Sequence, residues 1–200
     1  MKSARVSMGL IVGLALIIGV DVSLAHITPP VVLVSERDAV LGMTGGSTRF
    51  FVREVRLTSD ERDVIERQWG WRPEDEVYRF YLGRDEAGQL VAAVTFLTEY
   101  TIHGPVRVAV GIGPDGKIKG AHVVELTEET YPWLKPLLDQ DFTQDYIGRD
   151  SRASFGLGER VRRASPESMP QFYAQIVASL IQRGAILFDV AILKRGGGKA

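Results

Sequence analysis

The 200-residue chain contains no cysteine. This absence excludes disulfides, thiol catalysis, cysteine-ligated iron–sulfur clusters, attachment of c-type haem and a lipidated N-terminal cysteine. Neither sign of charge is in large excess either, because 24 basic and 25 acidic residues give a formal net charge of −1. A chain so balanced lacks the basic footprint of nucleic-acid-binding proteins, so no nucleic-acid partner is predicted.

Histidine is scarce, and the common catalytic motifs are absent. His26, His103 and His122 are the only histidines, and none has the spacing of a metal-binding motif, so no metal site is predicted. The sequence contains no nucleophile elbow, no P-loop and no GxGxxG fingerprint. No pair of carboxylates stands out as acid and base, so no catalytic residue is predicted.

The N-terminal apolar run is short for a membrane span. It covers Met8 to Val20, about 13 residues where about 20 are needed. Basic residues precede it, and the small-x-small tripeptide Ser23-Leu24-Ala25 follows. This order is typical of a secretory signal, so residues 1–25 predict export to the periplasm or another extracytoplasmic space. An uncleaved, tilted membrane anchor is the alternative.

Residues 26–76 are expected to form a small N-terminal extension with helices and a strand. Ser35 is a candidate cap for a short helix that ends near Leu41. The β-forming residues of Thr48 to Arg56 predict a strand. Thr58 and Glu61 have capping-box spacing, which predicts a second helix that Gly70 ends.

Residues 77–195 are expected to form the main domain, followed by a frayed tail at 196–200. Alternating and apolar segments predict four strands, Val77–Leu82, Leu90–Leu97, Val106–Ile112 and Ile118–Leu126. The short connections between them, such as Asp115-Gly116, favour an antiparallel meander. Pro132 to Gln140 is expected to be a short helix or a turn.

A long helix is predicted to close the domain. Ser165-Pro166-Glu167 is a helix start, because serine caps, proline suits the first turn and glutamate complements the dipole. An apolar face with helical spacing follows, made of Met169, Phe172, Tyr173, Ile176, Val177, Leu180 and Ile181. Gly184 is expected to end the helix, and 185–193 is either a strand or a short helix. The predicted class is therefore α+β, an antiparallel meander sheet packed by a long C-terminal helix.

The predicted hairpin and the acidic loop after it carry an ordered set of residues, namely Val108, Val110, Ile112, Asp115, Gly116, Ile118, Gly120, Val123, Glu125, Glu129, Thr130, Phe142 and Gly148. This set resembles the core of the FMN-binding domain family. The family includes the small flavin-carrying subunits of ion-pumping NADH:quinone and ferredoxin:NAD oxidoreductases. The resemblance covers about half of the mature chain and implies a flavoprotein.

The family's flavin-attachment motif is missing. That motif, Ser/Thr-Gly-Ala-Thr, carries FMN on a threonine hydroxyl through a phosphoester, and it would fall at Arg163–Ser168. This chain has no threonine beyond Thr143, and Tyr131-Pro132 replaces the family's glycine after Glu-Thr. Ser165 and Ser168 are the remaining candidate acceptors. The departure favours flavin held non-covalently.

The predicted FMN site combines a phosphate-binding part and a ring-binding part. Arginine forks and the N-terminus of the long helix suit a phosphate. Tyr131-Pro132-Trp133 in the acidic loop could stack on the isoalloxazine ring. The alternatives are a solvated loop with surface salt bridges and an aromatic packed under its own loop. The predicted cofactor-binding residues are Glu129, Thr130, Tyr131, Arg160, Arg162, Arg163, Ser165 and Ser168.

Three functions remain open from the sequence. The first is an exported, FMN-binding electron-transfer protein that works with a membrane or cytochrome redox partner. The second is a flavin-free binding or assembly module of an extracytoplasmic redox complex. The third, a stand-alone flavin enzyme, ranks last because no substrate-specific residues are found.

Overall fold

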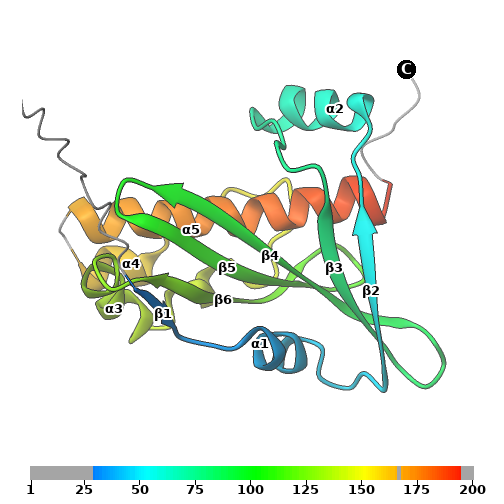
Figure 1. Cartoon of the computed structure of the whole chain (residues 1–200), viewed down its shortest axis with the longest axis horizontal. Coiled ribbons are helices and arrows are strands. Elements are labelled where there is room, and N and C mark those ends of the chain that lie inside the picture. Colours follow the sequence, from blue (N-terminus) through cyan, green and yellow to red (C-terminus); the bar gives the residue numbers. More distant parts are fainter. Residues whose placement is uncertain (1–28, 166–167, 195–200) are drawn as a thin grey trace, which may run out of the picture.

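The centre of the protein is one six-stranded antiparallel sheet with the order β1-β6-β5-β4-β3-β2. The structure is a computed structural model that describes residues 29–165 and 168–194. Helix α5 lies along one face of the sheet, and the short helix α1 lies on the other side (Figure 1). This arrangement confirms the predicted α+β class with a long C-terminal helix. The predicted signal segment and the tail at 196–200 lie outside the described residues.

The predicted meander is present, and its strands are β3 (Tyr78–Arg84), β4 (Leu90–Thr101), β5 (Gly104–Ile112) and β6 (Ile118–Thr127). Strands β4 and β5 are longer than predicted. The ladder between them continues to the pair Thr101–Gly104, so only two residues form the turn. Gly104 has a φ of 99°, a conformation that glycine adopts without strain.

The N-terminal elements are β1 (Pro30–Val32), α1 (Glu36–Met43), β2 (Arg49–Val55) and α2 (Ser59–Trp69). Strand β1 pairs with β6 and β2 pairs with β3, so this region supplies both edges of the same sheet. The Thr58–Glu61 capping box forms as predicted, and Gly70 ends α2 with a φ of 66°.

After the sheet come α3 (Tyr131–Leu138), the 3-10 turn η1 (Phe142–Tyr146), α4 (Glu159–Ala164), α5 (Ser168–Leu187) and the π-helical turn η2 (Phe188–Ile192). Ser165 is the C-terminal cap residue of α4. Helix α5 is described from Ser168, and the predicted first-turn residues 166–167 lie outside the described part of the chain.

Two predictions about the long helix are wrong. Gly184 does not end it, because α5 continues to Leu187 and into η2, so the predicted segment 185–193 is helical as far as Ile192. A Cβ at Gly184 would lie 3.0 Å from the Cβ of Val110 on β5, so this glycine permits close packing of helix on sheet. Phe172, predicted on the inner face, is 52% exposed.

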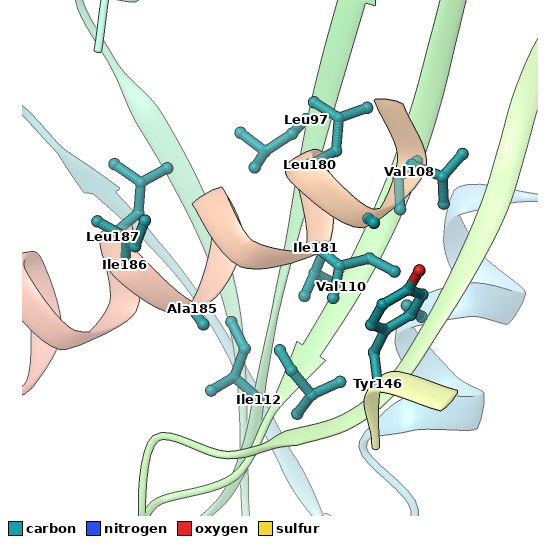
Figure 2. Packing of buried hydrophobic residues seen from close by; sticks show 14 of the residues in the cluster. Leu97, Val108, Val110, Ile112, Tyr146, Leu180, Ile181, Ala185, Ile186 and Leu187 are labelled. Carbon is teal, nitrogen blue, oxygen red and sulfur yellow. The ribbon is translucent and has the colours of Figure 1, made fainter. Parts of the chain in front are cut away.

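The core lies between α5 and the neighbouring strands (Figure 2). Leu97, Val108, Val110 and Ile112 project from the sheet, and Leu180, Ile181, Ala185 and Ile186 meet them from the helix. All of these side chains are at most 6% exposed. A second, smaller cluster places Ala39 and Met43 of α1 against the opposite face.

We expect Gly184→Val to destabilise the fold by about 1–3 kcal/mol, because the added atoms overpack the contact with Val110. Gly42→Ala is the matched control, since a Cβ in that turn of α1 meets nothing within 4 Å. This control should stabilise the chain by about 0.5–1 kcal/mol through helix propensity. Urea unfolding of both variants measures the difference, and equal effects would contradict the packing role of Gly184.

Candidate functional site

The predicted cofactor-binding residues all lie toward one end of the molecule. This end carries α3, α4, the start of α5 and the β4–β5 turn (Figure 1). Within it, however, they occupy separate places. Glu129 and Thr130 belong to a buried polar cluster, Tyr131 lines a small cavity beside His122, and the arginines lie on α4.

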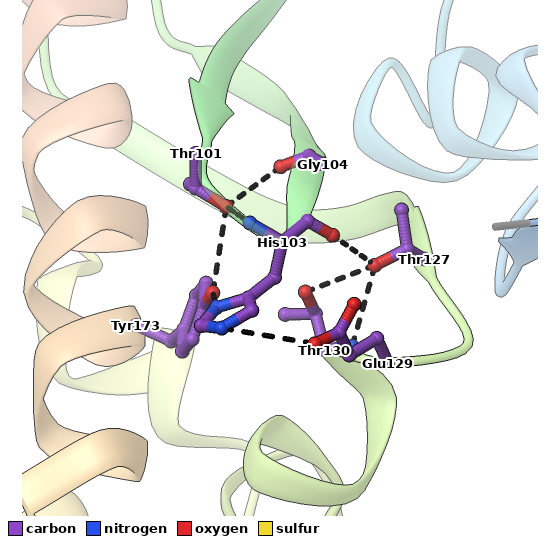
Figure 3. Close-up of polar contacts among 7 residues, drawn as sticks. All are labelled: Thr101, His103, Gly104, Thr127, Glu129, Thr130 and Tyr173. Atoms are coloured by element: carbon purple, nitrogen blue, oxygen red, sulfur yellow. Dashed lines mark hydrogen bonds and ion pairs between the residues drawn. The ribbon is translucent and has the colours of Figure 1, made fainter. Parts of the chain in front are cut away.

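The polar cluster is centred on His103 (Figure 3). Its Nδ1 lies 2.6 Å from the hydroxyl oxygen of Tyr173, and its Nε2 lies 3.7 Å from Oε1 of Glu129. Tyr173 is completely buried, whereas the Glu129 side chain is half exposed. The imidazole and the buried phenol are therefore within hydrogen-bond distance and can exchange a proton, whereas the Glu129 carboxylate lies at ion-pair distance from the imidazole, beyond a direct hydrogen bond.

Thr130 and Trp133 are engaged inside the same cluster. The hydroxyl of Thr127 donates to the carbonyl of His103 at 2.7 Å, and its oxygen lies 3.0 Å from that of Thr130. Trp133 stacks on Tyr173 with ring centroids 5.5 Å apart and an angle of 12° between the planes. These contacts tie the β4–β5 turn to the start of α3, and Thr130 is fully buried.

Two of the predicted arginines are neutralised by neighbouring carboxylates. Arg160 bonds to Asp145 through its guanidinium at 2.8 Å and through its backbone N–H at 3.2 Å. Arg163 bonds to Glu159 at 2.9 Å across one helical turn. Both arginines therefore form the salt bridges of the alternative interpretation, but on the helix α4 and not on a loop.

Arg162 instead lines a pocket of about 530 Å³ together with Asp145, Arg149, Ser154, Gly156, Leu157, Gly158 and Glu159. We call this the basic pocket. Among residues 29–165 and 168–194, no carboxylate oxygen lies within ion-pair distance of Arg149 or Arg162. The guanidinium of Arg149 is held over the ring of Tyr146 at 5.2 Å, and it donates to the carbonyl of Ser154. Arg149 is thus held in place and shares the pocket with Arg162, and two guanidiniums on one pocket suit an oxyanion such as phosphate.

The sequence missed Arg149 and the pairing of His103 with Tyr173. Arg149 follows η1 and lies outside any helix start, so no motif marks it. The second pair joins residues 70 positions apart, and no periodicity relates a turn histidine to a helical tyrosine. The two candidate acceptor serines also differ, because Ser165 is 6% exposed and Ser168 is exposed.

A scan against protein-family models found no matching family, and searches of the curated proteins and the solved structures found no matching protein. Ser168–Ile192 is long and apolar enough to cross a membrane, but 67% of its most apolar window is buried inside the fold. This burial is typical of the core helix of a globular domain.

Burial raises the pKa of Tyr146, which lies under Arg149, to about 12. The folded chain holds this proton more tightly than the unfolded chain does, so the resulting stabilisation is complete below pH 10 and lost as pH rises through 12. We expect the free energy of unfolding to fall over that range, and Tyr146→Phe to remove on the order of 2 kcal/mol of the fall.

Denaturant unfolding at several alkaline pH values measures this slope. Tyr100→Phe is the control, because that side chain is 81% exposed and its variant should keep the wild-type slope. Burial also raises the pKa of Tyr78 to about 12, but Tyr78 is present in both chains and cancels in the comparison. An unchanged slope in Tyr146→Phe would contradict the assignment.

Proposed function

We propose that this chain is an exported electron-transfer protein that binds FMN non-covalently and holds the flavin phosphate in the basic pocket. The observation that carries the proposal is the convergence of Arg149 and Arg162 on one pocket, where no carboxylate of the described residues pairs with either of them. The ordered resemblance of the hairpin and acidic loop to the FMN-binding domain family supports the choice of flavin. The signal-like residues 1–25 support export.

The residues of the pocket suit the phosphate end of FMN. Arg149 and Arg162 offer fork-shaped donors to its oxygens, and Gly156 allows close approach of the backbone, because a Cβ there would meet only the hydroxyl of Ser154, at 3.9 Å. The volume of about 530 Å³ lies within the range of about 300–1,000 Å³ that small-molecule sites occupy. The cations that line the pocket are arginines and not lysines. A guanidinium can bind two phosphate oxygens at once, whereas a lysine ammonium acts as a point charge.

Bound FMN would supply one- and two-electron transfer, and the protein would supply binding, orientation and tuning of the potential. A membrane or cytochrome protein on the outer side of the cytoplasmic membrane would then exchange electrons with it. The Glu129–His103–Tyr173 chain lies at the same end of the molecule and offers groups that hold and move protons.

A flavin-free assembly module is the second candidate, and one observation favours it. Thr130, Trp133 and Tyr173 satisfy one another inside the polar cluster, so the acidic loop already has internal partners. In this case the basic pocket would bind an anion other than flavin phosphate.

The first experiment is an absorbance spectrum of the chain from His26, purified after export and repeated after acid precipitation. Yellow protein whose colour leaves with acid supports non-covalent FMN. Colour that stays in the pellet would move the attachment to Ser165 or Ser168. A colourless protein whose spectrum and fluorescence do not respond to added FMN would favour the assembly module.

We expect Arg162→Gln to weaken FMN binding roughly 10- to 100-fold, because a hydrogen bond to a charged phosphate is worth about 1.5–3 kcal/mol. Arg163→Gln is the matched control on the same helix. Its side chain is bonded to Glu159 and largely exposed, so affinity should change less than about twofold. Quenching of flavin fluorescence measures both, and equal losses would contradict the basic pocket as the phosphate site.

A further inference from the structure

Strand β4 continues beyond the end of its ladder with β3, while it remains paired with β5. The ladder with β3 ends at the pair Phe80–Thr95, whereas the ladder with β5 continues to Thr101–Gly104. The last third of β4 therefore forms an edge of the sheet, visible in Figure 1 where β4 extends past β3. Open strand edges are usually covered, because they present unpaired backbone groups.

The geometry of the β4–β5 turn determines which backbone N–H and C=O groups point outward on this edge. Thr101 and Gly104 close a two-residue hairpin, so their N–H and C=O groups face each other. Hydrogen-bonding direction alternates along an antiparallel strand, which points the groups of Thr98 and Tyr100 away from β5. Within the described ranges, no strand lies beside these two residues.

A groove separates this edge from α5. Two adjoining hollows, of about 550 and 480 Å³, share Glu99, Tyr100 and Arg183 and run along the strand. The hollow near the hairpin turn combines the apolar or aromatic side chains of Tyr100, Ile102, Phe172 and Ile176 with polar ones. Phe172 is 52% exposed there and Ile102 is 93% exposed, although both are large and apolar. We call the two hollows together the β4–α5 groove.

The other end of the groove is acidic. Glu74 and Asp75 line it together with Arg72. The guanidinium of Arg72 is already bonded to carboxylates on α2. In the middle of the groove, Arg183 bonds to Glu99 at 2.6 Å and stacks on the ring of Trp71 at 5.1 Å. The carboxylates at this end are therefore the charges that a partner's cation would meet.

We propose that the β4–α5 groove binds an extended segment of a partner polypeptide, which adds as an antiparallel strand to β4. Its backbone pairs with Thr98 and Tyr100, and its alternate apolar side chains pack on Phe172. A lysine or arginine follows at its C-terminal end and faces Glu74 and Asp75. The acyl chains of a lipid offer no partner to the open N–H and C=O groups, whereas another backbone does.

The test uses the chain from His26, which contains every described element of the fold. The probe is the synthetic peptide acetyl-Ile-Thr-Val-Thr-Ile-Lys-amide. We expect hydrogen exchange at the backbone amides of Thr98 and Tyr100 to slow at least tenfold in its presence. The same peptide with alternate backbone nitrogens methylated keeps its side chains, and it should give no protection. Replacing its lysine with glutamate should weaken binding several-fold at low salt.

Phe172→Ser should lower the affinity for the peptide about tenfold, with FMN binding unchanged. Ile147→Ser is the matched control, because Ile147 is 43% exposed and does not line the groove. Absence of protection at millimolar peptide would overturn the proposal, as would equal binding of the methylated peptide. Binding to phosphatidylglycerol vesicles that depends on Phe172, with Thr98 and Tyr100 still exchanging rapidly, would overturn it in favour of a lipid surface.

Discussion

The close contact of α5 with the sheet at Gly184 and Val110 is the constraint on which the rest of the structure depends. It sets the distance of the helix from β5 and therefore the space that the buried side chains of both must fill. The same helix carries Tyr173 into the polar cluster and Phe172 to the groove, so both sites depend on its place on the sheet.

Much of the fold could be predicted because its signals are local. Alternation over two residues marks the meander strands, Asp115-Gly116 marks a turn, and Thr58 with Glu61 marks a helix start. The role of Gly184 could not be predicted from its neighbours in the sequence. The same residue that commonly stops a helix lies inside α5, because a strand more than 70 positions earlier in the chain approaches it too closely for a Cβ.

The candidate site was less predictable, because the sequence shows how many charged residues there are but not which of them form ion pairs in the folded chain. Five arginines lie between η1 and α5, namely Arg149, Arg152, Arg160, Arg162 and Arg163. Their roles depend on which carboxylates the fold brings near. Asp145 takes up Arg160 and Glu159 takes up Arg163, whereas Arg149 arrives from a segment with no motif. The aromatic residues behave in the same way. Trp133 could have met a ligand, but the fold supplies Tyr173 as its stacking partner.

Phe172 and Tyr173 are neighbours in sequence, with their rings 5.3 Å apart and nearly perpendicular, yet they belong to different environments. One ring lies at the groove and the other reaches His103. Rotation of α5 about its axis would move both rings together, but the tight contact at Gly184 leaves no slack for such rotation. Coupling of the groove to the histidine would therefore require changes of side-chain rotamer, on the fast timescale of single bonds, and not helix movement.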